Sequence, residues 1–93
     1  MAALLIGASA EGPGTGASLT GQSTIYVDDD SVFDGCQVII EVSHVDTDAK
    51  YVNTGKHFFK PGAVVLNIVG DYYVRAFIYN ARTDTSINCS AIN

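Results

Sequence analysis

Apolar and polar side chains alternate most clearly over residues 36–45. Apolar side chains occupy every second position from Cys36 to Val42, and polar ones fill the positions between, with Ile39 as the exception. This period of two predicts a strand with one face in a core and the other facing out. The predicted core consists of five aliphatic residues from this strand and later ones: Val38, Ile40, Val42, Val65 and Val74.

The rest of the chain also has the pattern of short strands separated by turns. Val, Ile, Thr, Tyr and Phe recur in short runs that Gly, Asp and Pro interrupt. The other predicted strands are residues 3–9, 17–20, 23–27, 50–53 with a continuation over 56–59, 63–69, 72–79 and 86–92. Lys60-Pro61-Gly62 predicts a break, and Gly70-Asp71 predicts a hairpin turn. No segment repeats apolar residues with the period of a helix.

About seven short strands with closely spaced turns predict an all-β fold. The expected architecture is a small antiparallel β-sandwich, Ig-like or jelly-roll-like, with a small barrel as the alternative. A chain of 93 residues is short enough for one domain, which we expect to cover residues 1–93. Residues 1–16, which end in a Gly-rich stretch, are predicted to form an extended N-terminal arm.

The composition excludes several classes of protein. Hydrophobic residues make up 47% of the chain and charged residues only 16%, which is too apolar for a disordered chain. No uncharged apolar run approaches the length that crosses a bilayer. The net charge of −5 argues against nucleic-acid binding, since that binding depends on Lys and Arg. We therefore expect neither a membrane nor a nucleic-acid partner.

The N-terminal residues 1–7 are apolar but contain no Lys or Arg, unlike a secretory signal. We therefore expect synthesis in a cytoplasm, where Cys36 and Cys89 stay reduced and unlinked. Both cysteines have aliphatic neighbours at alternate positions, which favours two small buried side chains. No Cys-x-x-Cys motif is present, and no cofactor or metal is expected.

Three stretches are candidates for chemistry. The Gly-rich residues 12–16 lack the Lys, the Ser/Thr and the following helix of a phosphate-binding loop. Asp28, Asp29 and Asp30 offer oxygen ligands to Ca²⁺ without the ligand spacing of an EF-hand, so a solvated loop is favoured and cation binding stays open. We expect no enzyme active site.

His44, Asp46 and Asp48 alternate along the chain and would share one face if the strand continued through them. An imidazole near two carboxylates would then be a candidate for metal binding or acid–base chemistry. Asp46-Thr47-Asp48 has the composition of a turn, however, and a turn would separate these side chains.

An aromatic row on the predicted strand 72–79 is the most informative feature. Tyr73, Arg75, Phe77 and Tyr79 share one face, while the opposite face is also apolar. A thin two-layer domain buries one face of a strand, so we expect the aromatic row to contact a partner chain. Aromatic residues and Arg are enriched at the centres of interfaces. Ile39 interrupts the polar face of its own strand and supports the same interpretation.

The order of these segments resembles small β-sandwich virion proteins of tailed bacteriophages. The residues that carry the resemblance are the stretches 12–21, 23–27 and 33–43, then Lys60-Pro61-Gly62-Ala63-Val64-Val65 and Gly70-Asp71-Tyr72-Tyr73-Val74-Arg75. The chain departs from the pattern at Cys36, where Ala is typical, and at Tyr51, which stands in the place of a Trp. The resemblance implies a structural role without an active site.

From this resemblance we expect a capsid decoration or cement protein on the surface of a virion. The expected partners are the major capsid protein and further copies of the chain, most simply as a homotrimer. A tail or fibre module is the alternative within phage biology. A small carbohydrate-binding module, with exposed tyrosines as stacking platforms, is the alternative from another class of protein.

Overall fold

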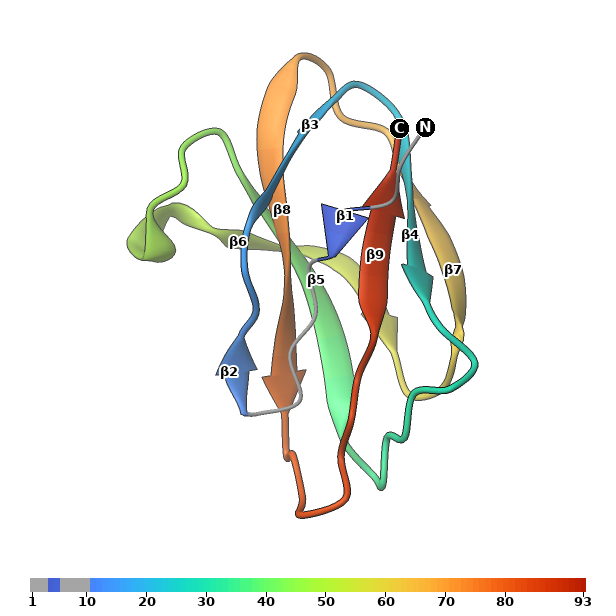
Figure 1. Ribbon diagram of the computed structural model, residues 1–93. Coiled ribbons are helices and arrows are strands. Elements are labelled where there is room, and N and C mark those ends of the chain that lie inside the picture. Colours follow the sequence, from blue (N-terminus) through green and yellow to red (C-terminus); the bar gives the residue numbers. More distant parts are fainter. Residues whose placement is uncertain (1–3, 6–10) are drawn as a thin grey trace.

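Two antiparallel sheets pack face to face in the computed structural model, which describes residues 4–5 and 11–93 (Figure 1). The first, here the β4 sheet, has the strand order β1 (Leu4–Leu5), β9 (Cys89–Ile92), β4 (Ser23–Val27) and β7 (Gly62–Leu66). The second, the β8 sheet, joins β8 (Asp71–Tyr79) to β5 (Gln37–Ser43) and β5 to β6 (Val52–Phe58). Its other edge consists of β2 (Gly12–Pro13) and β3 (Ala17–Thr20), which both pair with β8.

The predicted all-β sandwich is confirmed. The strands expected over residues 17–20 and 23–27 have the same bounds as β3 and β4. In the described part of the chain the helical structure is one short 3₁₀ turn, Asp48–Lys50, and no helix is long and apolar enough to cross a membrane. Of the strand expected over 3–9, the structure describes only Leu4–Leu5, and the remainder lies outside the described residues.

The core lies between the two sheets and is built from the inward positions of each strand. Val38, Ile40 and Val74 are completely buried, as predicted, and Val42 packs against the core while partly exposed. The expectation for Val65 is wrong, because its side chain is 44% exposed. Alternation along β7 directs Leu66 and Val64 inward, which leaves Val65 on the outer face, opposite Thr24 of β4.

Tyr72 links the two sheets at one end of the sandwich. Its side chain is 1% exposed, and its hydroxyl donates a hydrogen bond of 2.7 Å to the carbonyl oxygen of Gly21. The buried hydroxyl of Ser23, on β4, lies 2.7 Å from the same phenol oxygen. A buried phenol is stable only when its hydroxyl is bonded in this way.

The hairpin expected at Gly70-Asp71 is wrong. β7 belongs to the β4 sheet and β8 to the other sheet, so the segment between them crosses the sandwich. The inward face of β8 is fully apolar and has to cover the β4 sheet, which prevents β8 from pairing beside β7 within that sheet. Gly70 has a φ of +83° at this crossing, and its carbonyl oxygen accepts a hydrogen bond of 3.0 Å from the N–H of Gly21.

Candidate interaction surface

The aromatic row predicted from the sequence lies on the outer face of the β8 sheet. Tyr73, Arg75, Phe77 and Tyr79 alternate with the buried side chains of the same strand. Tyr73 and Phe77 are half-buried, and Tyr79 is 39% exposed. Arg75 is only 8% exposed, which the sequence analysis did not anticipate for a residue on an outer face.

An apolar stripe crosses the whole outer face at the level of Phe77. Phe77 lies directly opposite Pro13 of β2 on one side and Ile39 of β5 on the other, and Ile39 lies opposite His57 of β6. The ring of Phe77 stacks on that of Tyr79 with centroids 4.5 Å apart. We call these five residues the apolar stripe, although its last member, the exposed His57 on β6, carries a polar imidazole. Ile39, the exception in the sequence pattern, therefore continues an apolar surface.

Arg75 stands beside the apolar stripe and is bonded on several sides within the chain. Its Nε donates a hydrogen bond of 2.8 Å to Glu41 on β5, and its Nη1 donates one to Asp48. Its guanidinium lies 4.1 Å from the centre of the Tyr51 ring and 5.8 Å from that of Phe77, both cation–π distances. Burial lowers the pKa of Arg75, but the bonds to Asp48 and Glu41 outweigh it and raise the pKa.

Tyr51 reaches Arg75 because a 3₁₀ turn, Asp48–Lys50, folds the chain back before β6. The Tyr51 hydroxyl donates a hydrogen bond of 2.9 Å to Asp46. Burial and this hydrogen bond raise the pKa of Tyr51 to about 12. A side chain at Gly16 would collide with the Tyr51 hydroxyl and with Asp46, so a larger residue there would have to displace the hydrogen bond between them. No sequence pattern predicts this contact, since residues 16 and 51 are far apart along the chain.

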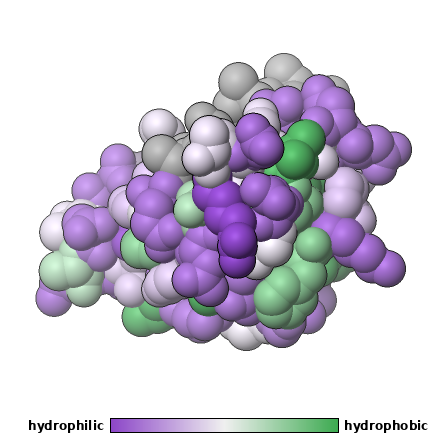
Figure 2. All heavy atoms as spheres, turned by 90° about the horizontal axis from the view of Figure 1, so that it is seen from below, coloured by the Kyte–Doolittle hydropathy of each residue, from purple (hydrophilic) through white to green (hydrophobic). Residues whose placement is uncertain are grey.

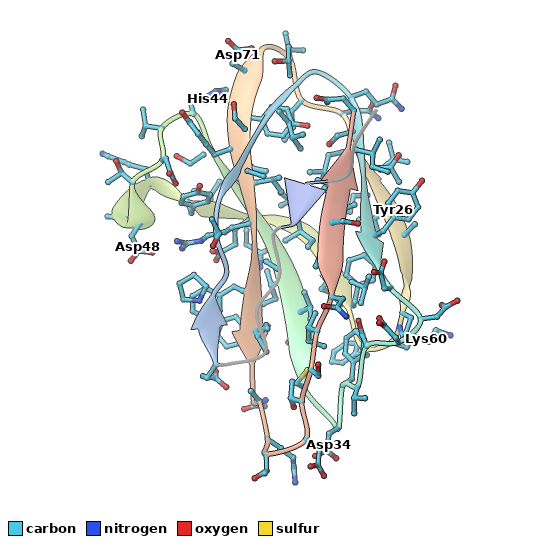
Figure 3. All side chains as sticks on the ribbon, viewed as in Figure 1. Tyr26, Asp34, His44, Asp48, Lys60 and Asp71 are labelled. Carbon is cyan, nitrogen blue, oxygen red and sulfur yellow. The ribbon has the colours of Figure 1, made fainter. Side chains whose placement is uncertain are left out.

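The candidate metal site at His44, Asp46 and Asp48 does not form. Strand β5 ends at Ser43, so the alternation that would place the three side chains on one face stops before them. His44 makes a hydrogen bond of 3.0 Å through Nδ1 to the carbonyl oxygen of Asp71, whereas Asp46 and Asp48 bond Tyr51 and Arg75. His44 and Asp48 lie well apart in Figure 3. Across residues 4–5 and 11–93, no cluster of three metal-ligating side chains occurs.

The acidic run 28–30 is an exposed loop that follows β4. Asp30 accepts hydrogen bonds of 3.1 and 3.2 Å from the side-chain amide of Asn88, which ties the loop to the segment before β9. The loop therefore has a structural contact of its own. Asp28 also lies close enough to Cys89 to influence the thiol.

Cys36 and Cys89 are free and buried in the core, as small apolar side chains would be. Burial raises the pKa of both thiols, and that of Cys89 reaches about 12 with a further contribution from Asp28. A thiol with a raised pKa carries little thiolate near neutral pH and reacts slowly.

The outer face of the β8 sheet thus combines an apolar stripe with an ion-pair network that is satisfied within the chain. Such a face favours recognition through shape and apolar contact, since its charges already have partners. Comparison of the chain with protein-family models, curated proteins and solved structures found no match.

Proposed function

We propose that the chain is a structural protein of a bacteriophage virion, a capsid decoration protein that binds the coat lattice. The resemblance in the order of its segments supports this proposal. The observation that carries the proposal is the apolar stripe, which crosses four strands on a rigid two-layer scaffold. The coat protein and further copies of the chain are its proposed partners, with three copies as the resemblance implies.

The arrangement of Arg75 favours a partner that binds without forming new ion pairs with this residue. Glu41 and Asp48 hold the guanidinium against the aromatic rings of Tyr51 and Phe77, so its contacts exist before a partner arrives. A partner that covers the stripe gains apolar burial without first breaking these bonds. Phe77 and Tyr79, stacked and partly exposed, are the anchors of such a contact.

The stacked pair is less suited to the carbohydrate-binding alternative. The ring planes of Phe77 and Tyr79 meet at 28° with centroids 4.5 Å apart, so each ring covers one face of the other. A sugar-binding platform needs ring faces that are open side by side. The tyrosines of this row therefore support a protein partner better than a saccharide.

Substitution of Tyr79 by Asp tests the proposal. Tyr79 is 39% exposed, so the fold tolerates a charge there, while the contact face becomes polar. The matched control is Val45→Asp, at a residue that is 50% exposed outside this face. We expect wild type and Val45→Asp to bind purified phage capsids in a copy number close to that of the coat protein, and Tyr79→Asp to lose most of this binding.

Circular dichroism checks that both variants remain folded. Wild-type binding only to tails would replace the proposal with the tail or fibre alternative. Binding to polysaccharide but not to capsids would replace it with the carbohydrate-binding alternative. Equal capsid binding by wild type and Tyr79→Asp would show that another face makes the contact.

A further inference from the structure

Strand β7 forms an open sheet edge in the described part of the chain. It is the last strand of the β4 sheet, and its pairing with β4 runs without interruption over all five residues, Gly62–Leu66. No backbone hydrogen bond from another described segment covers its outer edge. β7 has neither a charged residue nor a proline, and an edge of that kind is prone to pair with another strand.

Two other edges that the structure describes are blunted in ways that hinder pairing. The edge formed by β2 and β3 contains Pro13 and a gap between the two strands. β6 carries an irregularity opposite Ile40, where Gly55 adopts a φ of +85°. The Thr54 hydroxyl fills this irregularity, donating to the carbonyl oxygen of Ile40 and accepting from the N–H of Lys56. Bulges and prolines within a strand protect edges in this way, and β7 has neither.

The two ends of β7 differ in charge. Asp28 and Asp29 line a groove together with Gly62 and Ala63, at the beginning of the strand. At the other end, Lys56 lines a groove with the residues from Val65 to Ile68, and Lys50 lines an adjoining groove with Ile68. Lys60, just before β7, offsets part of the acidic charge. The edge is therefore acidic at its start and basic at its end.

The opposite charges at the two ends of β7 favour a second copy of the same strand as the partner. In an antiparallel pair of identical strands, the start of each strand lies beside the end of the other. Two copies of β7 would therefore place the acidic end of each copy beside the lysines of its partner, twice over. Complementary potentials of this kind determine orientation and register.

We propose that β7 pairs antiparallel with β7 of a second copy about a twofold axis near Val64. The pairing joins the two β4 sheets into one continuous sheet and satisfies the backbone groups of both edges. Because the same patch serves both copies, the contact closes on itself as a dimer. It is separate from the outer face of the β8 sheet and does not depend on the proposed function. In a chain that also forms the proposed trimer through that face, the β7 contact would join two trimers.

The side chains beside the edge agree with this pairing. With the axis near Val64, Val65 of each copy comes opposite Ala63 of the other, next to Tyr26 on β4. Val65 and Tyr26 are 44% and 39% exposed in the single chain. Both lie on the outer face of the β4 sheet, and Figure 3 shows Tyr26 on the side of the molecule where β7 forms the edge. The dimer would bury part of this apolar surface.

Apolar surface also occurs elsewhere, so it does not by itself identify the contact. Figure 2 shows separate hydrophobic patches at the end of the molecule, divided by hydrophilic ones. What distinguishes β7 is the combination of an unprotected backbone edge with opposite charges at its two ends. The contact involves short strands, so we expect a weak dimer that forms between about 10 µM and about 1 mM.

The test uses Val65→Lys, with Val45→Lys as its control. Both valines are about half exposed, but Val45 follows the end of β5 and does not line the grooves beside β7. Analytical ultracentrifugation should show dimer formation for wild type and Val45→Lys, and at least tenfold weaker association for Val65→Lys. Amide hydrogen exchange should slow at Gly62–Leu66 as the concentration of wild type rises. Circular dichroism verifies the fold of each variant.

A charge exchange tests the orientation of the pair. Lys56→Glu should weaken the dimer several-fold, and adding Asp29→Lys should restore much of the loss, because the two positions then attract again across the contact. A wild type that stays monomeric at about 1 mM would overturn the proposal. So would a dimer that Val65→Lys leaves intact, or one that Lys56→Glu strengthens.

Discussion

Replacement of Arg75 by Met would measure how strongly the outer face of the β8 sheet depends on its central ion pair. The side chains of Arg75 and Glu41 are 9% and 13% exposed, so this pair is largely removed from water. Breaking a buried pair costs about 3–5 kcal/mol, because one charge remains without a partner. Asp48 is 82% exposed, and its loss as a partner adds at most about 1 kcal/mol.

The guanidinium of Arg75 lies over the rings of Tyr51 and Phe77, and methionine replaces it with an apolar side chain of similar length, so the packing loss is small. We therefore expect Arg75→Met to lower the free energy of unfolding by about 3 kcal/mol. For a domain of this size that corresponds to a fall in Tm of roughly 12–24 °C. Urea denaturation followed by circular dichroism measures the free energy, and a thermal scan measures Tm.

The double variant Arg75→Met with Glu41→Met separates the cost of an unpaired charge from the value of the pair. Removing both charges leaves no buried ion, so the double variant should recover most of the loss. Asp48→Asn is the control for the exposed partner and should cost less than about 1 kcal/mol. A loss below about 0.5 kcal/mol for Arg75→Met, or a double variant no more stable than the single one, would refute the assignment of Arg75 to a buried pair.

Three further outcomes are expected. Ile40→Ala should lower the free energy of unfolding by about 2–5 kcal/mol in urea denaturation, since Ile40 is completely buried; a loss below about 0.5 kcal/mol would contradict its place in the core. Cys36 and Cys89 should both titrate as free thiols after unfolding without reductant and react slowly in the folded protein at pH 8, whereas a protein that yields no thiol when unfolded would contain a disulfide. The pKa of Tyr51 is about 12 in the folded protein and about 10 in the unfolded chain, so between these pH values only the unfolded chain loses the proton. The free energy of unfolding should therefore fall as pH rises from about 10 to about 12, and Tyr51→Phe should reduce this fall. A fall of the same slope in Tyr51→Phe would contradict the raised pKa.

The strands were predictable from the sequence wherever one face of a strand is buried and the other exposed. β3 and β4 have the expected bounds because a polar or glycine residue ends each apolar alternation. The wrong assignment of Val65 arose because the residues Gly62–Leu66 are all apolar. The polar Asn67, two positions after Val65, is the one residue of the predicted run 63–69 that marks the outward side. The hairpin at Gly70 failed for a related reason, since a local turn pattern does not say which sheet the next strand joins.

The candidate surface was predictable in part. Alternation along β8 correctly placed Tyr73, Arg75, Phe77 and Tyr79 on one face. The burial of Arg75 was not predictable, because it depends on Tyr51 and Asp48, which a 3₁₀ turn brings across from a distant segment. The metal interpretation of the residues after β5 failed because alternation cannot show where a strand ends.

The strand order has a consequence for how the chain acquires its structure. β5 and β6 are the only neighbours in sequence that pair within residues 4–5 and 11–93, whereas β1 pairs with β9, β3 with β8 and β4 with both β7 and β9. Neither sheet can be completed until the C-terminal segments have left the ribosome, and the N-terminal strands remain unpaired until then. Topologies dominated by such distant pairings fold in milliseconds to seconds. During that interval the aggregation-prone apolar strands stay exposed, which makes synthesis the most vulnerable period in the life of this protein.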